Sequence, residues 1–105
     1  MALTRDFKAT VKARAARDPA FRVALLTEAV ELLLSGKVET GKAILRDYIN
    51  ATVGFERLAK ETGTPSKSLM RMLGPKGNPR AINLLTVIGA LQQVAGLHLE
   101  VAAAR

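Results

Sequence analysis

Cationic and hydroxyl side chains cluster in one short stretch, residues 64–71, where their types suit contact with a polyanion. Arg71 is the strongest candidate, because its planar guanidinium can donate to O6 and N7 of a guanine together. Ser66 and Lys67 come earlier in the stretch and would reach base edges or the adjacent phosphates. Met70 offers an apolar contact for a thymine methyl group, or packs within the protein. These residues form a candidate nucleic-acid contact if one element presents them together.

Two short helices joined by a tight turn would present them. Phe55, Leu58 and Ala59 recur at helical spacing, and Gly63 ends this first helix. The small Ala59 lets the two helices cross closely, while Gly63 permits the left-handed backbone of a sharp turn. The pattern therefore predicts a helix and a turn directly before the cationic stretch.

The second helix is predicted over residues 65–73. Thr64 is a suitable N-cap, and Pro65 is tolerated at the first helical position because its missing N–H would be unpaired there. Leu69 and either Met72 or Leu73 would face inward. A helix packed on one side and cationic on the other is typical of a helix-turn-helix recognition helix, which enters the DNA major groove. Its outward face would comprise Ser66, Lys67, Ser68, Met70 and Arg71.

The charge distribution favours the same partner. The chain carries 16 Lys and Arg against 9 Asp and Glu, a net charge of +7. No acidic residue occurs between Glu61 and Glu100, which is the electrostatic footprint expected for a polyanion partner. Charge alone would indicate only a solvated basic surface, but its coincidence with the helix-turn-helix pattern favours DNA. The basic residues of the acid-free stretch are Lys67, Arg71, Lys76 and Arg80.

At 105 residues the chain is long enough for one hydrophobic core, and a single domain over 1–105 is expected. Asp18-Pro19 is a strong helix start, and Gly36 is a helix end. The expected parts are N-terminal helices (1–53), the helix-turn-helix (54–74), a loop and last helix (75–95) and a strand (96–101). The helices predicted outside the helix-turn-helix span residues 4–16, 19–35, 38–51 and 80–94.

The helix predicted over residues 4–16 is basic, and it has a short apolar stripe of Phe7, Val11 and Ala15. Such a helix is usually solvated, but it can contact DNA backbone, a membrane surface or an acidic partner. The shortness of its stripe argues against the membrane.

The helix predicted over residues 19–35 carries two apolar stripes, whereas a surface helix needs only one. A central helix buried on two sides explains this pattern most simply. The functional alternative is that the second stripe, Leu26, Val30 and Leu33, docks against another chain such as a protein partner.

A loop dense in turn-forming residues, GPKGNP at 74–79, follows the recognition helix. Asn78 is expected to cap the last helix and Pro79 to open it. Backbone N–H groups of the loop, Lys76 and the helix N-terminus would together make a phosphate clamp, although an ordinary turn would use the same residue types. The last helix is expected to place Leu84, Leu85, Ile88 and Leu91 in the core.

Residues 97–101 alternate apolar and polar side chains after Gly96, the period of a half-buried strand. An isolated strand leaves its backbone groups unpaired. Its expected partner is the same strand of a second copy about a two-fold axis, and a frayed tail is the alternative. The residues of this dimer strand are Leu97, Leu99 and Val101.

Catalytic and metal-binding chemistry is not indicated. The chain has no cysteine and one histidine, His98, so a His-Cys metal cluster or a Ser-His-Asp triad cannot be assembled. Residues 36–43, GKVETGKA, imitate a phosphate-binding P-loop, but Ala43 replaces the magnesium-binding Ser or Thr. We expect no cofactor and no enzyme activity. The sequence has no apolar run long enough to span a bilayer and no cleavable signal pattern. We therefore expect a cytoplasmic protein with no membrane partner.

The chain resembles the addiction-module antidote proteins, HigA-like antitoxins with a Cro/lambda-repressor-like fold. The resemblance covers most of the chain and is strongest over residues 55–101. The spacing of Leu, Ala and Gly occurs in many repressors, whereas the GNP turn joined to the terminal strand is more specific. Thr62 and Thr64 replace residues that are more often apolar, which weakens the packing expected at the turn. The residues that carry the resemblance are Leu58-Ala59, Gly63, 67–73, Gly77-Asn78-Pro79, Asn83-Leu84, Val87-Ile88 and 97–101.

This resemblance implies an all-α fold of five to six helices, lambda-repressor-like, with a short C-terminal β-strand that pairs across a homodimer. It implies binding to double-stranded operator DNA, repression of the protein's own operon, and neutralisation of a RelE/ParE-like toxin encoded next door. The dimer would read two half-sites about 34 Å apart. The predicted base-edge contacts are Ser66, Lys67, Met70 and Arg71, and the predicted phosphate contacts are Thr64, Ser68, Lys76 and Asn78.

Two other functions fit the same residues. A stand-alone phage- or stress-type repressor would share the DNA chemistry but would have no toxin gene beside its own. A protein-interaction module that has lost DNA binding would keep the fold, but the basic recognition face argues against it. RNA binding is disfavoured, because so few aromatic residues offer little surface for base stacking.

Overall fold

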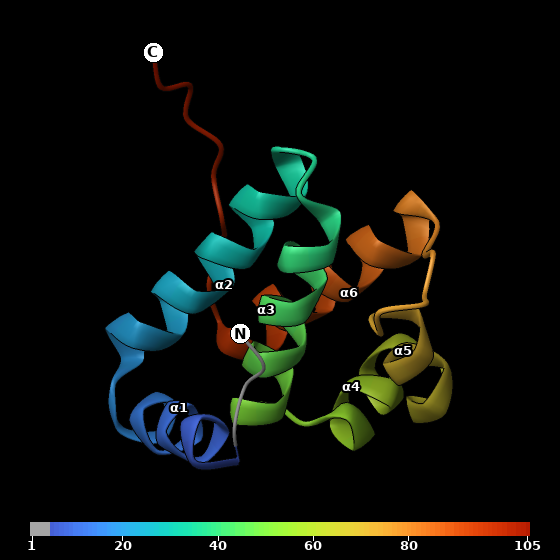
Figure 1. Ribbon diagram of the computed structural model, residues 1–105, viewed down its shortest axis with the longest axis horizontal. Coiled ribbons are helices and arrows are strands. Elements are labelled where there is room, and N and C mark those ends of the chain that lie inside the picture. Colours follow the sequence, from blue (N-terminus) through green and yellow to red (C-terminus); the bar gives the residue numbers. More distant parts are fainter. Residues whose placement is uncertain (1–4) are drawn as a thin grey trace.

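Six helices make up the chain in the computed structural model, which describes residues 5–105 and the side chains from Lys8 onward (Figure 1). Within this part of the chain the fold is all-α, as predicted, and no strand is formed. The predicted helix start at Thr4 and the stripe position of Phe7 lie outside the described residues and side chains. The helices are α1 (Arg5–Arg17), α2 (Pro19–Leu34), α3 (Val38–Ala51), α4 (Phe55–Thr62), α5 (Ser66–Met72) and α6 (Ala81–Ala95).

The helices α2 and α3 pack along each other as an antiparallel pair, and α1 lies across one end of the pair (Figure 1). Gly41 allows this pair to approach closely, because a Cβ there would lie 2.8 Å from Leu33 Cγ. In the second half of the chain, α4 packs against both α5 and α6. One core joins the two halves, and its buried members are Leu26, Ala29, Leu45, Tyr48, Ile49, Phe55, Leu58, Leu69, Leu73, Val87 and Leu91.

The start of α2 follows the prediction made from its sequence. Asp18 is the N-cap, and its carboxylate accepts the N–H of Phe21 at 3.1 Å. Pro19 occupies the first turn, where the missing N–H leaves no unmet bond.

The second apolar stripe of α2 packs against the core of the same chain. Leu26 is fully buried, and Val30 and Leu33 are partly buried against the same core. Leu26 is therefore closed to another chain, and docking of a protein partner on the exposed parts of Val30 and Leu33 stays a prediction. α2 packs along α3, and Gly41 of α3 allows a close contact with Leu33, which agrees with a central place for α2.

The predicted caps of the last two helices are wrong by one or two residues. Pro65, not Thr64, is the N-cap of α5, and Arg80, not Asn78, is the N-cap of α6; neither helix has a side-chain cap bond. In α5 the proline is extended (φ −57°, ψ 143°), and its carbonyl accepts the N–H of Leu69 at 3.1 Å. A proline before a helix fits the N-cap position as well as the first helical position, so sequence did not distinguish them.

One member of the predicted core stripe of α6 is also wrong. Ile88 and Leu91 are buried and Leu84 packs against the core, but Leu85 is 64% exposed. Val87 is buried in its place, because it shares the helix face of Leu84 and Leu91 at spacings of three and four residues.

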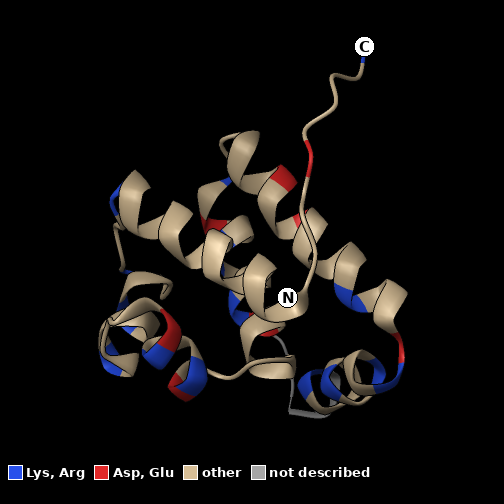
Figure 2. Cartoon of the chain, turned by 180° about the vertical axis from the view of Figure 1, so that it is seen from behind, with Lys and Arg blue, Asp and Glu red and all other residues tan. Residues whose placement is uncertain are grey.

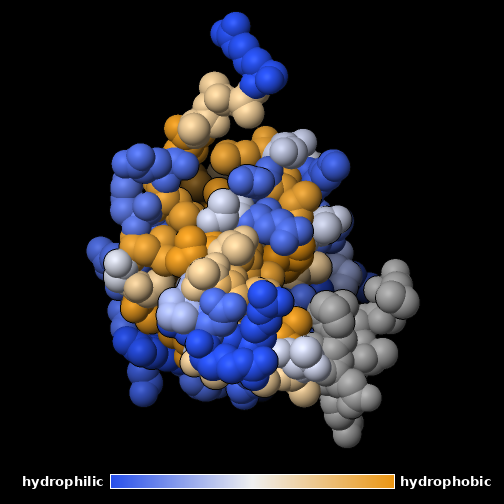
Figure 3. Space-filling view, turned by 90° about the vertical axis from the view of Figure 1, so that its left-hand side faces the viewer, coloured by the Kyte–Doolittle hydropathy of each residue, from blue (hydrophilic) through white to orange (hydrophobic). Residues whose placement is uncertain are grey.

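The C-terminal segment keeps the predicted alternation without forming a strand in this single chain. Leu97 and Leu99 pack against the core, while Val101 is 84% exposed. Gln92 provides bonds that a lone strand would lack, since its side chain accepts the N–H of Leu99 at 2.8 Å and its carbonyl accepts that of Leu97 at 3.0 Å. Figure 3 shows an apolar area on the face of the molecule below this tail. Strand pairing with a second copy stays a prediction.

Candidate nucleic-acid interface

Gly63 ends α4 and begins the turn to α5, as its sequence predicts. Gly63 has φ +73°, a left-handed conformation that glycine adopts without the steric cost of a Cβ. Its N–H donates to the carbonyl of Ala59 at 2.9 Å, which ends α4. Leu69 and Leu73 are buried beneath α5, so the opposite side of this helix is free to face solvent.

The outward face of α5, formed by Ser66, Lys67, Met70 and Arg71, carries the four predicted base contacts on one short helix. Lys67 and Arg71 are exposed, and Met70 is 46% exposed. Among the side chains described from residue 8 onward, the ion pairs are Arg14–Asp18, Glu39–Lys42 and Arg57–Glu61. The two cations of α5 are therefore held by none of these carboxylates and are available to an external anion.

Ser66 differs from its neighbours because its hydroxyl is already engaged. It donates to the Glu56 carboxylate of α4 at 3.2 Å. A contact from Ser66 to a base or a phosphate would have to share or replace this bond, so Ser66 is the weakest of the four predicted base contacts.

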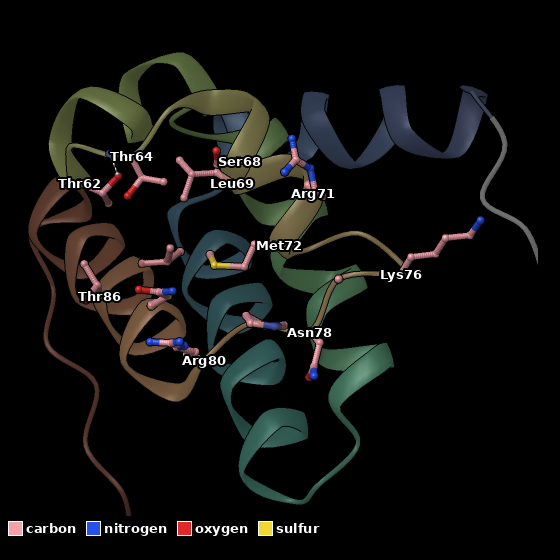
Figure 4. A pocket seen from close by; sticks show the side chains of 14 residues that line it. Thr62, Thr64, Ser68, Leu69, Arg71, Met72, Lys76, Asn78, Arg80 and Thr86 are labelled. Carbon is pink, nitrogen blue, oxygen red and sulfur yellow. Dashed lines mark hydrogen bonds between the residues drawn. The ribbon is translucent and has the colours of Figure 1, made fainter.

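A groove of about 500 Å³ runs between α5, the loop at residues 74–80 and the first turns of α6 (Figure 4). We call it the α5–α6 groove. Figure 4 shows the Lys76 side chain extending away from the loop, on the side of the groove opposite Thr86. The groove brings all four predicted phosphate contacts, Thr64, Ser68, Lys76 and Asn78, to one place together with Arg71.

The N-terminus of the last helix was predicted as part of a phosphate clamp, but the side chains that Arg80 and the first turns of α6 bring to the groove were not. Arg80, Asn83 and Thr86 line the groove opposite α5, and each is exposed. The sequence did contain a signal for Arg80, because it belongs to the basic residues of the acid-free stretch. Asn83 and Thr86 could not be found that way, since their place in the groove depends on how α6 crosses the loop.

Two cations of α3 hold the loop from behind. The Lys42 ammonium donates to the carbonyls of Gly74 at 3.0 Å and Gly77 at 2.7 Å. The Arg46 guanidinium donates to the carbonyl of Leu73. Cations near the last carbonyls of α5 are also favoured by the dipole of that helix. In the sequence, Lys42 stands out only as part of the P-loop imitation at residues 36–43, most of which lies within α3, as the predicted helix over 38–51 implies.

The loop can come this close to α5 only because residue 77 is a glycine. A Cβ on Gly77 would lie 2.2 Å from the Arg71 carbonyl oxygen and 2.3 Å from that of Met72. Gly77 thus lets the chain turn back over the end of α5, which places Lys76 beside the groove.

Positive charge gathers on α1 and on the α4–α5 unit with its loop, whereas α6 carries no charged residue (Figure 2). The clearest pKa changes lie away from the groove, on α3. Burial raises the pKa of Asp47, although the nearby Lys8 and Arg46 act to lower it. Burial likewise raises the pKa of Tyr48, against a hydrogen bond with Thr52 and the charge of Arg22.

A metal site and a membrane span are two features that residues 5–105 lack. These residues contain no group of three His, Asp or Glu placed to hold a metal ion. Within the same range, no helix has the length and apolar character needed to cross a bilayer. No protein-family model, curated protein or solved structure matches this chain.

Proposed function

We propose that this protein binds double-stranded DNA with α5 in the major groove. The observation that carries the proposal is the two-sided character of α5. Leu69 and Leu73 anchor one side in the core, and Lys67 and Arg71 stand exposed on the other, paired with no carboxylate among the described side chains. A helix of this kind can approach base edges without first breaking contacts within the protein.

In this proposal the two sides of the interface have different tasks. Arg71 donates to a guanine, Lys67 reaches a base edge or the adjacent phosphate, and Met70 contacts a thymine methyl group. Residues of the α5–α6 groove bind phosphates and set the register of the protein on the duplex. Arg80 joins the phosphate contacts, because it lines the same groove as Lys76.

The biological role that we propose is that of an antitoxin of the HigA-like type, which represses its own operon and neutralises a RelE/ParE-like toxin in the cytoplasm. The support is the resemblance of residues 55–101 together with a compatible helix arrangement, in which α4, the Gly63 turn and α5 pack beside α6. We further propose that the fold is Cro/lambda-repressor-like and that two copies pair through residues 97–101.

The test of DNA binding is a titration of the protein with a labelled duplex taken from upstream of its own gene, at several salt concentrations and with unrelated DNA as competitor. We expect tighter binding to the upstream duplex and a linear fall of log affinity with log salt. Equal affinity for both duplexes would reduce the proposal to non-specific binding. An absence of binding at low salt would overturn it and would favour a protein-interaction module.

The toxin partner is tested separately by co-expressing the chain with the product of the adjacent reading frame. Co-purification at fixed stoichiometry and relief of growth inhibition are expected for an antitoxin. Specific DNA binding without a toxin gene alongside would instead indicate a stand-alone repressor.

A further inference from the structure

Lys42 is fully buried in the protein, although lysine is among the residues least often found inside. A buried ammonium is tolerated only where its N–H groups and its charge find partners. Here the three donors of the ammonium have three acceptors: the carbonyls of Gly74 and Gly77 and, at 3.0 Å, the Glu39 carboxylate. The lysine is therefore fully satisfied, and two of its three partners belong to the loop beside the α5–α6 groove.

The two carbonyls that Lys42 holds stand on either side of Lys76. Gly74 precedes Lys76 by two residues and Gly77 follows it directly, so the backbone of Lys76 is fixed at both ends. The loop is closed by a further bond, from the N–H of Gly77 to the carbonyl of Gly74 at 3.0 Å. The Lys42 ammonium thus sets where the exposed cation Lys76 leaves the protein surface.

A lysine is a poor choice if this position served stability alone. Replacing a buried charge and its partner by apolar side chains of similar volume is often neutral or stabilising, because no charge then has to lose its water. What the ammonium adds is direction, since each N–H has to point at one acceptor. An apolar side chain would fill the same space but would remove the link from α3 to both loop carbonyls, and would leave the Gly74 carbonyl with the Gly77 N–H alone.

We propose that Lys42 is a positioning residue for polyanion binding, which acts by holding the loop so that Lys76 meets a phosphate at the α5–α6 groove. The inference rests on the proposed DNA-binding function and extends it to a residue that no nucleic acid touches. It assigns to α3, outside the helix-turn-helix, a part in the register of the protein on its duplex.

The test compares the salt dependence of DNA binding in Lys42→Met, Lys76→Ala and the double variant. Because the slope of log affinity against log salt reports phosphate contacts, Lys76→Ala should lower its magnitude by about one. Lys42→Met should lower it by a similar amount, and the double variant should lose no more than Lys76→Ala alone. A role in stability alone would shift the unfolding midpoint of Lys42→Met but leave the slope unchanged.

Lys37→Met is the matched control, because it removes the same charge from an exposed position at the start of the same helix. It should keep the wild-type slope. If Lys42→Met does not fold, Gly77→Ala displaces the same loop with Lys42 intact and should reproduce the loss.

The possible outcomes separate the inference from the function on which it rests. A wild-type chain without salt-dependent DNA binding would overturn the proposed function. A wild-type chain that binds, with the slope of folded Lys42→Met unchanged, would overturn this inference alone. Equal losses in Lys42→Met and Lys37→Met would also overturn it, since charge and not position would then be the cause.

Discussion

Single side chains at the interface differ in what they can recognise, although several carry the same charge. The Arg71 guanidinium presents a fixed pair of donors, whereas the ammonium groups of Lys67 and Lys76 act as point charges. Only the first arrangement matches the two acceptors on the major-groove edge of a guanine. In the proposed complex, base preference therefore depends most on Arg71, and overall affinity is shared among the cations.

Replacing Arg71 by alanine should weaken operator binding by about 1–3 kcal/mol and relax the preference at one base pair. Binding to a set of duplexes with each operator position varied would measure both effects. Arg57→Ala is the control, because it removes an exposed arginine of α4 that pairs with Glu61. If Arg71→Ala kept both the affinity and the base preference, α5 would not read the DNA in the proposed way.

Asp47 gives a prediction for stability against pH. Burial raises its pKa in the folded chain, so folding favours the protonated carboxyl. This contribution to stability is present below the ordinary carboxyl pKa and is lost as pH rises through the raised value. Asp47→Asn, which cannot ionise, should therefore unfold at higher urea concentration than wild type near pH 7, and this difference should shrink in acid.

Glu28→Gln is a suitable control for the Asp47 experiment, since it removes one negative charge from an exposed site on α2. A lower midpoint for Asp47→Asn at neutral pH would mean that the attraction to Lys8 and Arg46 outweighs the effect of burial.

At the scale of helices, Gly89 lowers the stability of α6, although no neighbouring group requires a glycine there. Gly89 lies in the middle of the helix and is exposed, and a Cβ added there would meet nothing within 4 Å outside the backbone of its own helix. Because glycine destabilises a helix interior relative to alanine, Gly89→Ala should raise the free energy of unfolding by roughly 0.5–1 kcal/mol. Urea unfolding measures this directly, and a destabilised variant would mean that some other element approaches the helix there.

The N-terminal ends of α2 and α5 can be compared in a further prediction about stability. Asp18→Ala should cost about 0.5–2 kcal/mol, since it removes the N-cap bond to Phe21, whereas Asp18→Asn should retain most of the stability. Thr64→Ala should cost far less, because Thr64 makes no cap bond to α5. Thermal unfolding of the three variants tests this, and similar losses at Asp18 and Thr64 would contradict the assignment of the caps.

The sequence carried most of the local information about these elements and little of the long-range information. Apolar spacing located the helices, and a glycine correctly marked the end of α4 at residue 63. The cap of α2 was found because Asp18 stands directly before a proline of the first turn, but Thr64-Pro65 has the same form and a different outcome. Pro19 and Pro65 each follow a residue that is a suitable N-cap. Pro19 nevertheless lies in the first turn of its helix, whereas Pro65 is itself the N-cap.

The candidate site shows the same division. The outward residues of α5 and the phosphate residues of the loop were predictable, because each set lies within a few positions of the chain. The role of Lys42 was not, since its partners Gly74 and Gly77 follow it by 32 and 35 residues. Arg80 was visible only as a charge, and its place in the groove became clear from the packing of α6.

Across the described residues, positive charge is unevenly distributed and gathers on α1 and on the α4–α5 unit with its loop (Figure 2). The cationic α4–α5 unit and its loop lie at one side, while α6 is uncharged along its length (Figure 2). A duplex would orient the chain through the first surface before any base is read, because electrostatic attraction acts at longer range than hydrogen bonding.

Two-fold pairing gives a prediction for operator geometry. If two copies bind together, their α5 helices should fit half-sites about 34 Å apart, one turn of DNA. Inserting about five base pairs, half a turn, between the half-sites should abolish joint binding, and inserting a full turn should not restore it, because the half-sites would then lie about 68 Å apart. Analytical ultracentrifugation of the complexes would count the bound chains, and equal occupancy for all spacings would contradict a symmetric dimer.

Lys42 is the one buried lysine of this protein, and every other lysine, from Lys8 to Lys76, is exposed. An acylating reagent added to the native chain would therefore modify the exposed amines quickly and reach Lys42 only when the fold opens. Mass spectrometry of the Lys42 peptide would then time that opening without any dye or introduced label, and its delay relative to the other lysines would measure how long the native state persists.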